Sequence, residues 1–158
     1  MCSDEWKVKK HQLKWPVFFD FLGRFIIIRS LLNKKHIMKV KNYKDLIVWK
    51  KSIELVDQVY TVTKRLPKSE VYGLSSQMQR AAVAISSNIA EGSTRNHRNE
   101  FIQFLGIANA SAAELETQLI IASRQYKIFE IDQALSTLDE ILRMLRSLVK
   151  TLKDSCAR

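Results

Sequence analysis

The chain has 158 residues, and 26 Lys and Arg against 16 Asp and Glu give it a net charge of +10. Four Gly and two Pro leave little strand punctuation, which argues against a β-rich fold. The two cysteines, Cys2 and Cys156, lie near opposite ends and form neither a CxxC pair nor a metal-ligand spacing. These features predict an all-helical, reduced, cytoplasmic protein for which anionic partners, nucleic acid among them, are expected.

The first 37 residues differ in character from the rest. Their net charge is +5, as is that of the 121 residues that follow, and residues 15–32 are aromatic and apolar. This stretch is short and internally charged for a membrane span, and no signal-peptide cleavage site follows it. Since the sequence from Met38 onward is a plausible beginning of a folded domain, we expect residues 1–37 to be an N-terminal extension from a misassigned start codon. A weak membrane-surface segment is the alternative, and residues 38–158 are expected to form the folded domain.

Two amphipathic helices are predicted in the first half of this domain. The first spans about residues 44–65 and ends before Pro67, which cannot continue a helix. The second spans about residues 72–92, with Ser69 as a candidate N-cap and Gly92 ending it in a left-handed conformation. The core stripe of the first is Leu46, Trp49, Ile53, Val56, Tyr60 and Thr63. The core stripe of the second is Leu74, Met78, Ala81, Ile85 and Ile89.

Two longer helices follow, over about residues 98–127 and from Phe129 onward. Asp132 suits the first turn of the last helix, as a cap or as a partner of the helix dipole. The third core stripe is Phe101, Phe104, Leu105, Ala108, Ala112, Leu115, Leu119, Ala122 and Tyr126. The fourth is Leu135, Leu138, Ile141, Leu142, Leu145, Leu148, Val149 and Leu152. Four amphipathic helices with short connections predict an antiparallel up-down four-helix bundle.

Some apolar side chains lie outside the core stripes. On the third helix a second apolar line lies about 110° around the helix from the first. Val83 is a further apolar residue, on the outer side of the second helix among polar neighbours. This is more apolar surface than one bundle needs, so subunit contact is expected. The candidate oligomer-interface residues are Val83, Ile102, Ala113 and Ile120.

Catalytic machinery is not expected. Of the three histidines, His11 and His36 lie in the N-terminal extension, and His97 lies in a predicted turn. The sequence has no Glu-x-x-His pair for a metal bundle, no glycine-rich phosphate loop and no nucleophile motif. We therefore expect a non-enzymatic protein that needs no metal and no cofactor.

Three polar residues near the helix seams form a candidate structural network. They are Asn88, Glu91 and Glu116. An unpaired buried amide costs about 1–3 kcal/mol, so Asn88 must find a partner, either the backbone or a facing Glu. A ligand pocket is the alternative interpretation.

The cations give the clearest functional lead. On the last helix, basic residues recur at spacings of three and four beside the core stripe, and others lie on the second helix and in the turn after it. Phosphate binding needs only such clustered cations. The candidate nucleic-acid-binding residues are Arg80, Arg95, Arg98, Arg143, Arg146, Lys150 and Lys153. The alternative is that they solubilise the bundle and pair with Asp139, Glu140 and Glu116.

Three segments carry a resemblance to a known family. They read YKDLIVWKKSIELV, LPKSEVYGLSSQMQRAAVAISSNIAEGSTR and EFIQFLGIANASAAELETQL, within about residues 41–152. They resemble the four-helix-bundle proteins of the 23S ribosomal RNA intervening sequences, and SNIAEG is the most specific part. This chain departs from that pattern with Ser86 in place of a common Pro and Ala110 in place of a frequent Gly.

The resemblance implies a homopentameric ring of four-helix bundles with a central channel. The chain is also similar to the accessory variability determinant of diversity-generating retroelements, a basic pentamer that binds nucleic acid and a reverse transcriptase. A non-enzymatic protein that binds structured RNA or RNA/DNA, or assists a partner enzyme, is the function that these resemblances imply. A protein-binding adaptor or scaffold with no direct nucleic-acid role is the alternative. No binding residue is transferred from either family.

Overall fold

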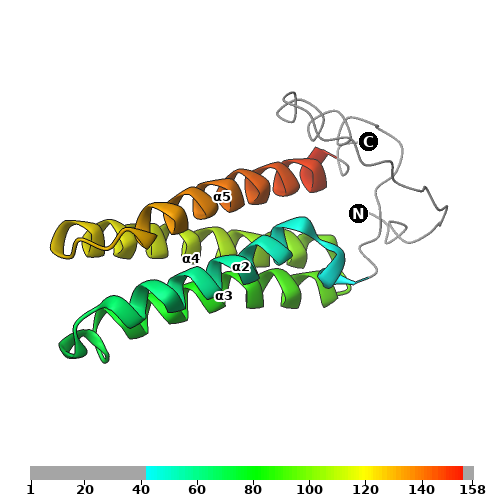
Figure 1. Cartoon of the computed structure of the whole chain (residues 1–158). Coiled ribbons are helices and arrows are strands. Elements are labelled where there is room, and N and C mark those ends of the chain that lie inside the picture. The colour runs from blue at the N-terminus through cyan, green and yellow to red at the C-terminus, as the bar shows by residue number, and fades with distance from the viewer. Residues whose placement is uncertain (1–41, 155–158) are drawn as a thin grey trace, which may run out of the picture. The chain divides into compact units, whose positions relative to one another are not determined.

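The computed structural model describes residues 42–154, which form four α-helices and two short 3-10 helices (Figure 1). In chain order these are η1 (Tyr43–Asp45), α2 (Ile47–Arg65), η2 (Lys68–Glu70), α3 (Leu74–Thr94), α4 (Arg98–Gln125) and α5 (Glu130–Asp154). The prediction of an all-helical fold is therefore confirmed for the described part of the chain. The predictions for residues 1–37, Cys2 and Cys156 lie outside the described residues.

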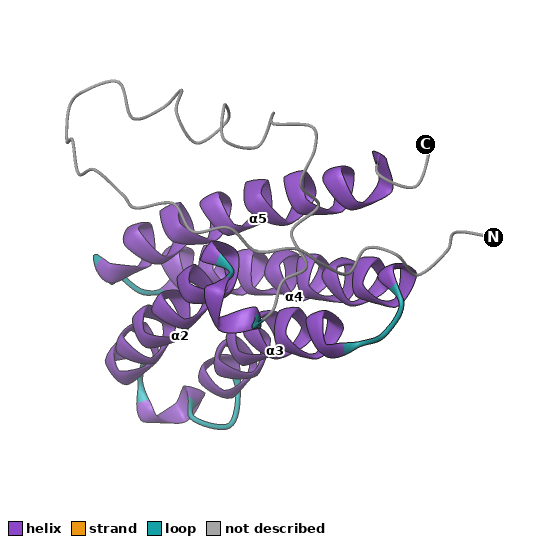
Figure 2. Ribbon diagram, turned by 90° about the vertical axis from the view of Figure 1, so that its right-hand side faces the viewer, coloured by secondary structure: helices purple, strands orange, loops and turns teal. Residues whose placement is uncertain are grey.

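Each long helix packs against two others, so the four helices enclose one core. The contacting pairs are α2 with α3, α3 with α4, α4 with α5, and α5 with α2. The α2–α3 and α4–α5 connections lie at one end of the bundle, and the α3–α4 connection lies at the other (Figures 1 and 2). This is an antiparallel up-down four-helix bundle. No helix within residues 42–154 has the length and apolar content that crossing a bilayer requires.

The apolar stripes of α3, α4 and α5 form the core as predicted. The side chains of Met78, Ile85, Leu105, Leu115 and Leu145 are fully buried. Helical periodicity alone found these positions because apolar residues recur on them without interruption. Phe104 and Tyr126, predicted in the same stripe of α4, are only half-buried.

The predicted core stripe of α2 is wrong at Ile53 and Tyr60, whereas Thr63 is buried and Leu46, Trp49 and Val56 are partly buried against the core. Ile53 is 38% exposed and Tyr60 is 41% exposed, whereas the stripe about 100° around the helix is buried. That buried stripe is Val48, Ser52, Leu55, Val59, Val62 and Leu66. Ser52 interrupts its apolar pattern, but the Ser52 hydroxyl donates a hydrogen bond to the Trp49 carbonyl oxygen at 2.6 Å. The polar atom is thereby satisfied within its own helix, and the residue can face the core.

The prediction that Gly92 ends the second helix is also wrong. Gly92 is buried within α3, which continues to Thr94. A Cβ atom at this position would lie 2.5 Å from Phe104 Cβ and 2.9 Å from Phe101 Cδ2. Glycine is therefore required here because α4 approaches closely, and no left-handed turn is involved.

A carboxylate ties together the two loops at one end of the bundle. Ser69, the predicted N-cap, lies within η2, and Gly73 occupies the N-cap position of α3. The Leu74 amide instead donates to Glu70 Oε2 at 3.0 Å. The other oxygen of that carboxylate accepts a hydrogen bond from the Tyr126 hydroxyl at 2.9 Å. Glu70 thus joins the α2–α3 loop to the C-terminal end of α4.

Removing the Tyr126 hydroxyl should destabilise the protein in a pH-dependent way. The hydrogen bond to Glu70, reinforced by burial and by the charge of that carboxylate, raises the pKa of the Tyr126 phenol above 10.0. Because the folded state holds this proton more tightly, the added stability is fully present below the unfolded pKa and is lost as pH rises through the folded pKa. Thermal melts of Tyr126→Phe should therefore fall below wild type at pH 7 and converge with it in strong alkali. A difference that stays constant into alkali would contradict this.

Candidate nucleic-acid interface

The described bundle is close to neutral. Residues 42–154 contain fifteen Lys and Arg and thirteen Asp and Glu, a net charge of +2 out of +10 for the whole chain. The bundle can therefore attract a polyanion only where its own cations are segregated from its acids. The distribution of charge over the four helices decides whether such a place exists.

Charge is unevenly divided between two opposite sides of the bundle. No charged residue lies between Arg80 and Glu91 on α3, or between Glu100 and Glu114 on α4. These two helices share the most extensive helix–helix contact in the fold. We call the outer surface of these segments the uncharged face. Most of the charge of the bundle lies on α2 and α5, which pack against each other on the other side.

Apart from Asp154 at its last position, acidic and basic residues are separated along α5. The first half carries Glu130, Asp132, Asp139 and Glu140, of which Glu130 and Asp132 lie in the first turn, where the dipole favours negative charge. Two of them are bound to α2, since Glu140 pairs with Lys51 at 2.8 Å and Glu130 pairs with Arg65 at 3.3 Å. The hydrogen bond to Glu140 raises the pKa of the Lys51 ammonium, against the effect of its partial burial.

In the second half of α5, from Arg143 to Lys153, every charged residue is a cation. We call Arg143, Arg146, Lys150 and Lys153 the basic ridge, and all four side chains are exposed. Arg143 pairs with Asp139 at 3.0 Å, whereas the other three make no ion pair with any residue in the range 42–154. Arg146 projects about 160° around the helix from Glu130, so it points away from the acids that face α2. The helix dipole favours cations only in the last turn of α5, so it explains Lys153 but not the earlier members of the basic ridge.

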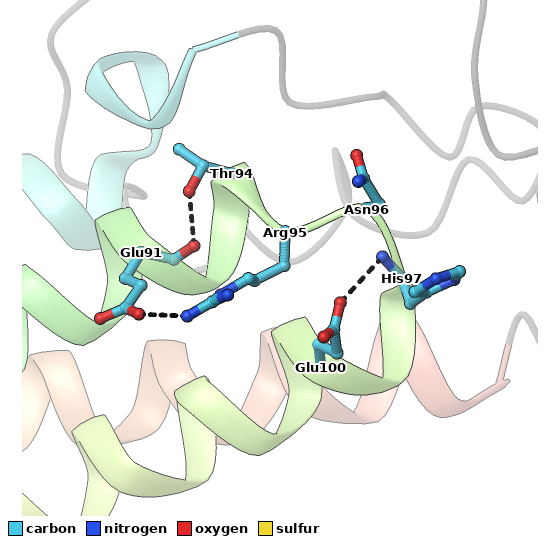
Figure 3. A pocket seen from close by; sticks show the side chains of 6 residues that line it. All are labelled: Glu91, Thr94, Arg95, Asn96, His97 and Glu100. Carbon is cyan, nitrogen blue, oxygen red and sulfur yellow. Dashed lines mark hydrogen bonds and ion pairs between the residues drawn. The ribbon is translucent and has the colours of Figure 1, made fainter.

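The α3–α4 corner engages most of its charged side chains internally (Figure 3). Arg95 forms an ion pair with Glu91 and lies over the Phe104 ring, 5.0 Å from its centroid. Glu100 accepts a hydrogen bond from the His97 amide at 3.3 Å and completes a capping box at the start of α4. These groups line an open polar depression formed by Glu91, Thr94, Arg95, Asn96, His97 and Glu100.

The structure divides the candidate cations between the two ends of the bundle. Arg95 and Arg98 lie at the end where α5 finishes, the same end as Lys150 and Lys153 (Figure 1). Arg80 is in α3, fifteen residues before Arg95, the residue that follows this helix, which is a separation of about 22 Å. Arg80 therefore does not belong to the same cluster. Its exposed side chain makes no ion pair within the described chain.

The three candidate network residues have separate partners. The Asn88 amide donates to the Ala84 carbonyl oxygen at 2.7 Å, so it bonds to the backbone of its own helix. Glu91 pairs with Arg95, and Glu116 is half-buried on α4 with no hydrogen bond to any residue between 42 and 154. The structure does not join the three in one network.

The candidate interface residues lie on or beside the uncharged face. Val83 is 41% exposed and Ile120 is 40% exposed, while Ala113 is exposed and Ile102 is half-buried. Sequence reasoning missed Ile107 and Ile121, which are 49% and 45% exposed on α4. Their spacing of fourteen residues, two heptads, was the signal for this second line. Exposed apolar residues thus lie on α4 outside its core-facing stripe.

The described residues hold no group of three His, Cys, Asp or Glu side chains that could bind a metal ion. Fold and charge distribution define a small helical-bundle protein with one charged and one uncharged side. The model of the 23S rRNA-intervening sequence protein family matches residues 44–147, so the chain belongs to that family.

The structural comparison agrees with this assignment. A solved structure of a protein of unknown function from the S23 ribosomal protein family of Bacteroides thetaiotaomicron is similar, with a TM-score of 0.61 and 27% sequence identity. The similarity covers 66% of this chain and 99% of that one. A comparison with curated proteins gave no match.

Proposed function

We propose that this protein is a non-enzymatic, oligomeric, RNA-binding bundle of the cytoplasm. Its basic ridge contacts phosphates of structured RNA, and its uncharged face is the subunit interface. The observation that carries the proposal is the run of exposed cations from Arg143 to Lys153, uninterrupted by any acid. The name of the family, which refers to 23S ribosomal RNA, supports RNA as the polyanion.

The oligomeric part of the proposal rests on the uncharged face. Val83 and Ile107 are exposed on this face, and Ile120 and Ile121 are exposed beside it on α4. Several apolar side chains exposed on one side of a bundle are typical of an interaction site. The resemblance of the sequence to pentameric families makes a homopentamer the proposed assembly. A measured mass of about five times the 18.3 kDa chain would support it.

The experiment is RNA binding by the full chain at two salt concentrations, on material whose mass is known from light scattering. Affinity for an RNA duplex should fall steeply with salt, because each neutralised phosphate releases condensed counterions. The double variant Arg146→Glu with Lys150→Glu should lower the affinity about 10-fold or more, and should flatten the salt dependence. Its thermal melt should match that of wild type, since both side chains are exposed.

The matched control keeps the charge and changes only the side chain. Arg146→Lys with Lys150→Arg should bind the duplex as wild type does, because phosphate contacts need charge more than a particular geometry. Unchanged affinity in the charge-reversed variant would remove the basic ridge from the account. No binding by wild type at low salt would overturn the proposed function.

An adaptor that binds a partner enzyme, such as a reverse transcriptase, is a second candidate. The exposed side chains of Ile107 and Ile121 favour this function. If contact between copies of this chain does not cover them, they form an apolar surface that a different protein can bind. A complex with such an enzyme that survives nuclease treatment would support the adaptor function. A complex that dissolves with nuclease would point back to RNA.

A further inference from the structure

Two aromatic rings are almost fully exposed at one end of the bundle. Tyr72, in the α2–α3 loop, is 95% exposed, and Phe129, in the α4–α5 loop, is 87% exposed. No larger exposure is found among the large hydrophobic residues of the described chain. This end lies opposite the α3–α4 corner and the last turn of α5 (Figure 1). The proposed phosphate contacts and subunit interface leave both rings unused.

The two loops that carry these rings are fixed to each other. Tyr126, three residues before Phe129, donates its hydroxyl hydrogen bond to Glu70, two residues before Tyr72. Arg65, at the end of α2, pairs at 3.3 Å with Glu130, the residue after Phe129. Both interactions join the α2–α3 side of the bundle to the α4–α5 side at this end. Both rings therefore belong to loops at an end of the bundle that is held together by a hydrogen bond and an ion pair.

Cations with no ion-pair partner lie in and beside the loops that carry the rings. The exposed basic residues in and beside the loops that make no ion pair within residues 42–154 are Lys64, Lys68, Arg124 and Lys127. The nearby acids are mostly engaged, because Glu70 accepts two hydrogen bonds and Glu130 pairs with Arg65. Only Asp132 is exposed and unpaired among the acids of these loops and of the first turn of α5. A surface with aromatic rings and an excess of cations complements a polyanion that has flat π-faces.

We propose that this loop end binds unpaired nucleotides, with bases stacked on Tyr72 and Phe129 and phosphates near the surrounding cations. Proteins that hold single-stranded nucleic acid combine these two elements, and stacking works for every base because each has a π-face. The inference rests on the proposed function in taking RNA as the partner. It adds a second contact that distinguishes single-stranded from duplex RNA.

The observations favour single-stranded nucleic acid over a membrane surface. Helices that lie in the membrane interface bury a continuous apolar face, whereas this end offers two separate loop rings and Val71, which is 50% exposed. Stacking requires only isolated rings with accessible faces, and the exposures of Tyr72 and Phe129 meet this requirement.

The test compares three probes on the full chain: oligouridine RNA, an abasic oligomer of the same length, and an RNA duplex. The double variant Tyr72→Ala with Phe129→Ala should lose about 5- to 140-fold in affinity for oligouridine per stacked base. Its affinity for the abasic oligomer and for the duplex should stay at the wild-type value. The ring-preserving variant Tyr72→Phe with Phe129→Tyr should bind oligouridine as wild type does.

Ile47→Ala is the matched control, since Ile47 is 64% exposed at the other end of the bundle, and it should leave binding of all three probes unchanged. Three results with the double alanine variant would overturn the inference: unchanged oligouridine affinity, an equal loss on the abasic oligomer, or a smaller mass by light scattering. Loss of binding to phosphatidylserine vesicles, with oligouridine binding intact, would assign the rings to a membrane instead. If the charge-reversed basic-ridge variant weakens duplex binding while the double alanine variant leaves oligouridine binding unchanged, this inference alone fails and the proposed function stands. Failure of wild type to bind any RNA would end both proposals.

Discussion

Replacing Gly92 with alanine is expected to lower the free energy of unfolding by about 2 kcal/mol or more. A Cβ atom at this buried position would lie 2.5 Å from Phe104 Cβ, an atom that cannot move without its backbone. The helices α3 and α4 would have to separate, although the change from Gly to Ala by itself favours a helix by about 1 kcal/mol. Urea denaturation with linear extrapolation would measure the loss.

Gly106→Ala is the matched control for this substitution. Gly106 lies on the exposed side of α4, and a Cβ there would meet no atom within 4 Å. With no contact to oppose it, the helix propensity of alanine should raise the free energy of unfolding by about 0.5–1 kcal/mol. Equal effects of the two substitutions would mean that α3 and α4 do not meet at Gly92.

Truncating Leu55 to alanine is expected to lower the free energy of unfolding by about 2–5 kcal/mol. The Leu55 side chain is fully buried at the centre of α2, so the shorter side chain leaves a cavity. Ile53→Ala, two residues earlier in the same helix, should cost about 1 kcal/mol because Ile53 is 38% exposed. Denaturation of the two variants under the same conditions compares them directly.

These two variants decide which stripe of α2 faces the core. If Ile53→Ala costs as much as Leu55→Ala, the predicted stripe through Ile53 and Tyr60 is also covered in solution, by another subunit. Ser52→Ala is informative beside them, because the Ser52 hydroxyl bonds only to its own helix. Its removal should change stability little, since no other group is left without a partner.

The sequence sufficed for much of the fold, and the exceptions have physical causes. In α3, α4 and α5 the predicted stripes contain only apolar residues and none of these is exposed, so the 3.6-residue period identifies them, although Ser75, Ser86 and Gln118 are buried as well. In α2 the buried stripe contains Ser52, and the neighbouring stripe contains Trp49 and Tyr60, so the period alone selects the wrong one. The sequence predicts a helix end at Gly92 because glycine is common at that position. Glycine is instead required there because Phe104, on another helix, lies too close for a Cβ atom.

The candidate site was less accessible to sequence reasoning. The basic ridge lies on one helix, so the spacing of its residues in the sequence was enough to place Arg146 and Lys150 on the same side of α5. Which end of the bundle each cation occupies depends on helix pairing, and Arg80 was grouped with residues at the other end. The loop end depends on a hydrogen bond between Glu70 and Tyr126, 56 residues apart in the sequence. The sequence therefore did not show that Tyr72 and Phe129 lie in two loops at the same end of the bundle.

The close approach of α3 and α4 also limits which sequences this fold can accept. At Gly92 the constraint is side-chain volume, because the rings of Phe101 and Phe104 occupy the space that any larger residue would need. On the outer surface of α4, by contrast, Gly106 has room for growth. A remote relative of this chain should therefore be recognisable by a vacant side-chain position in one helix matched to bulky rings at the start of the next, even where all surface charge has changed.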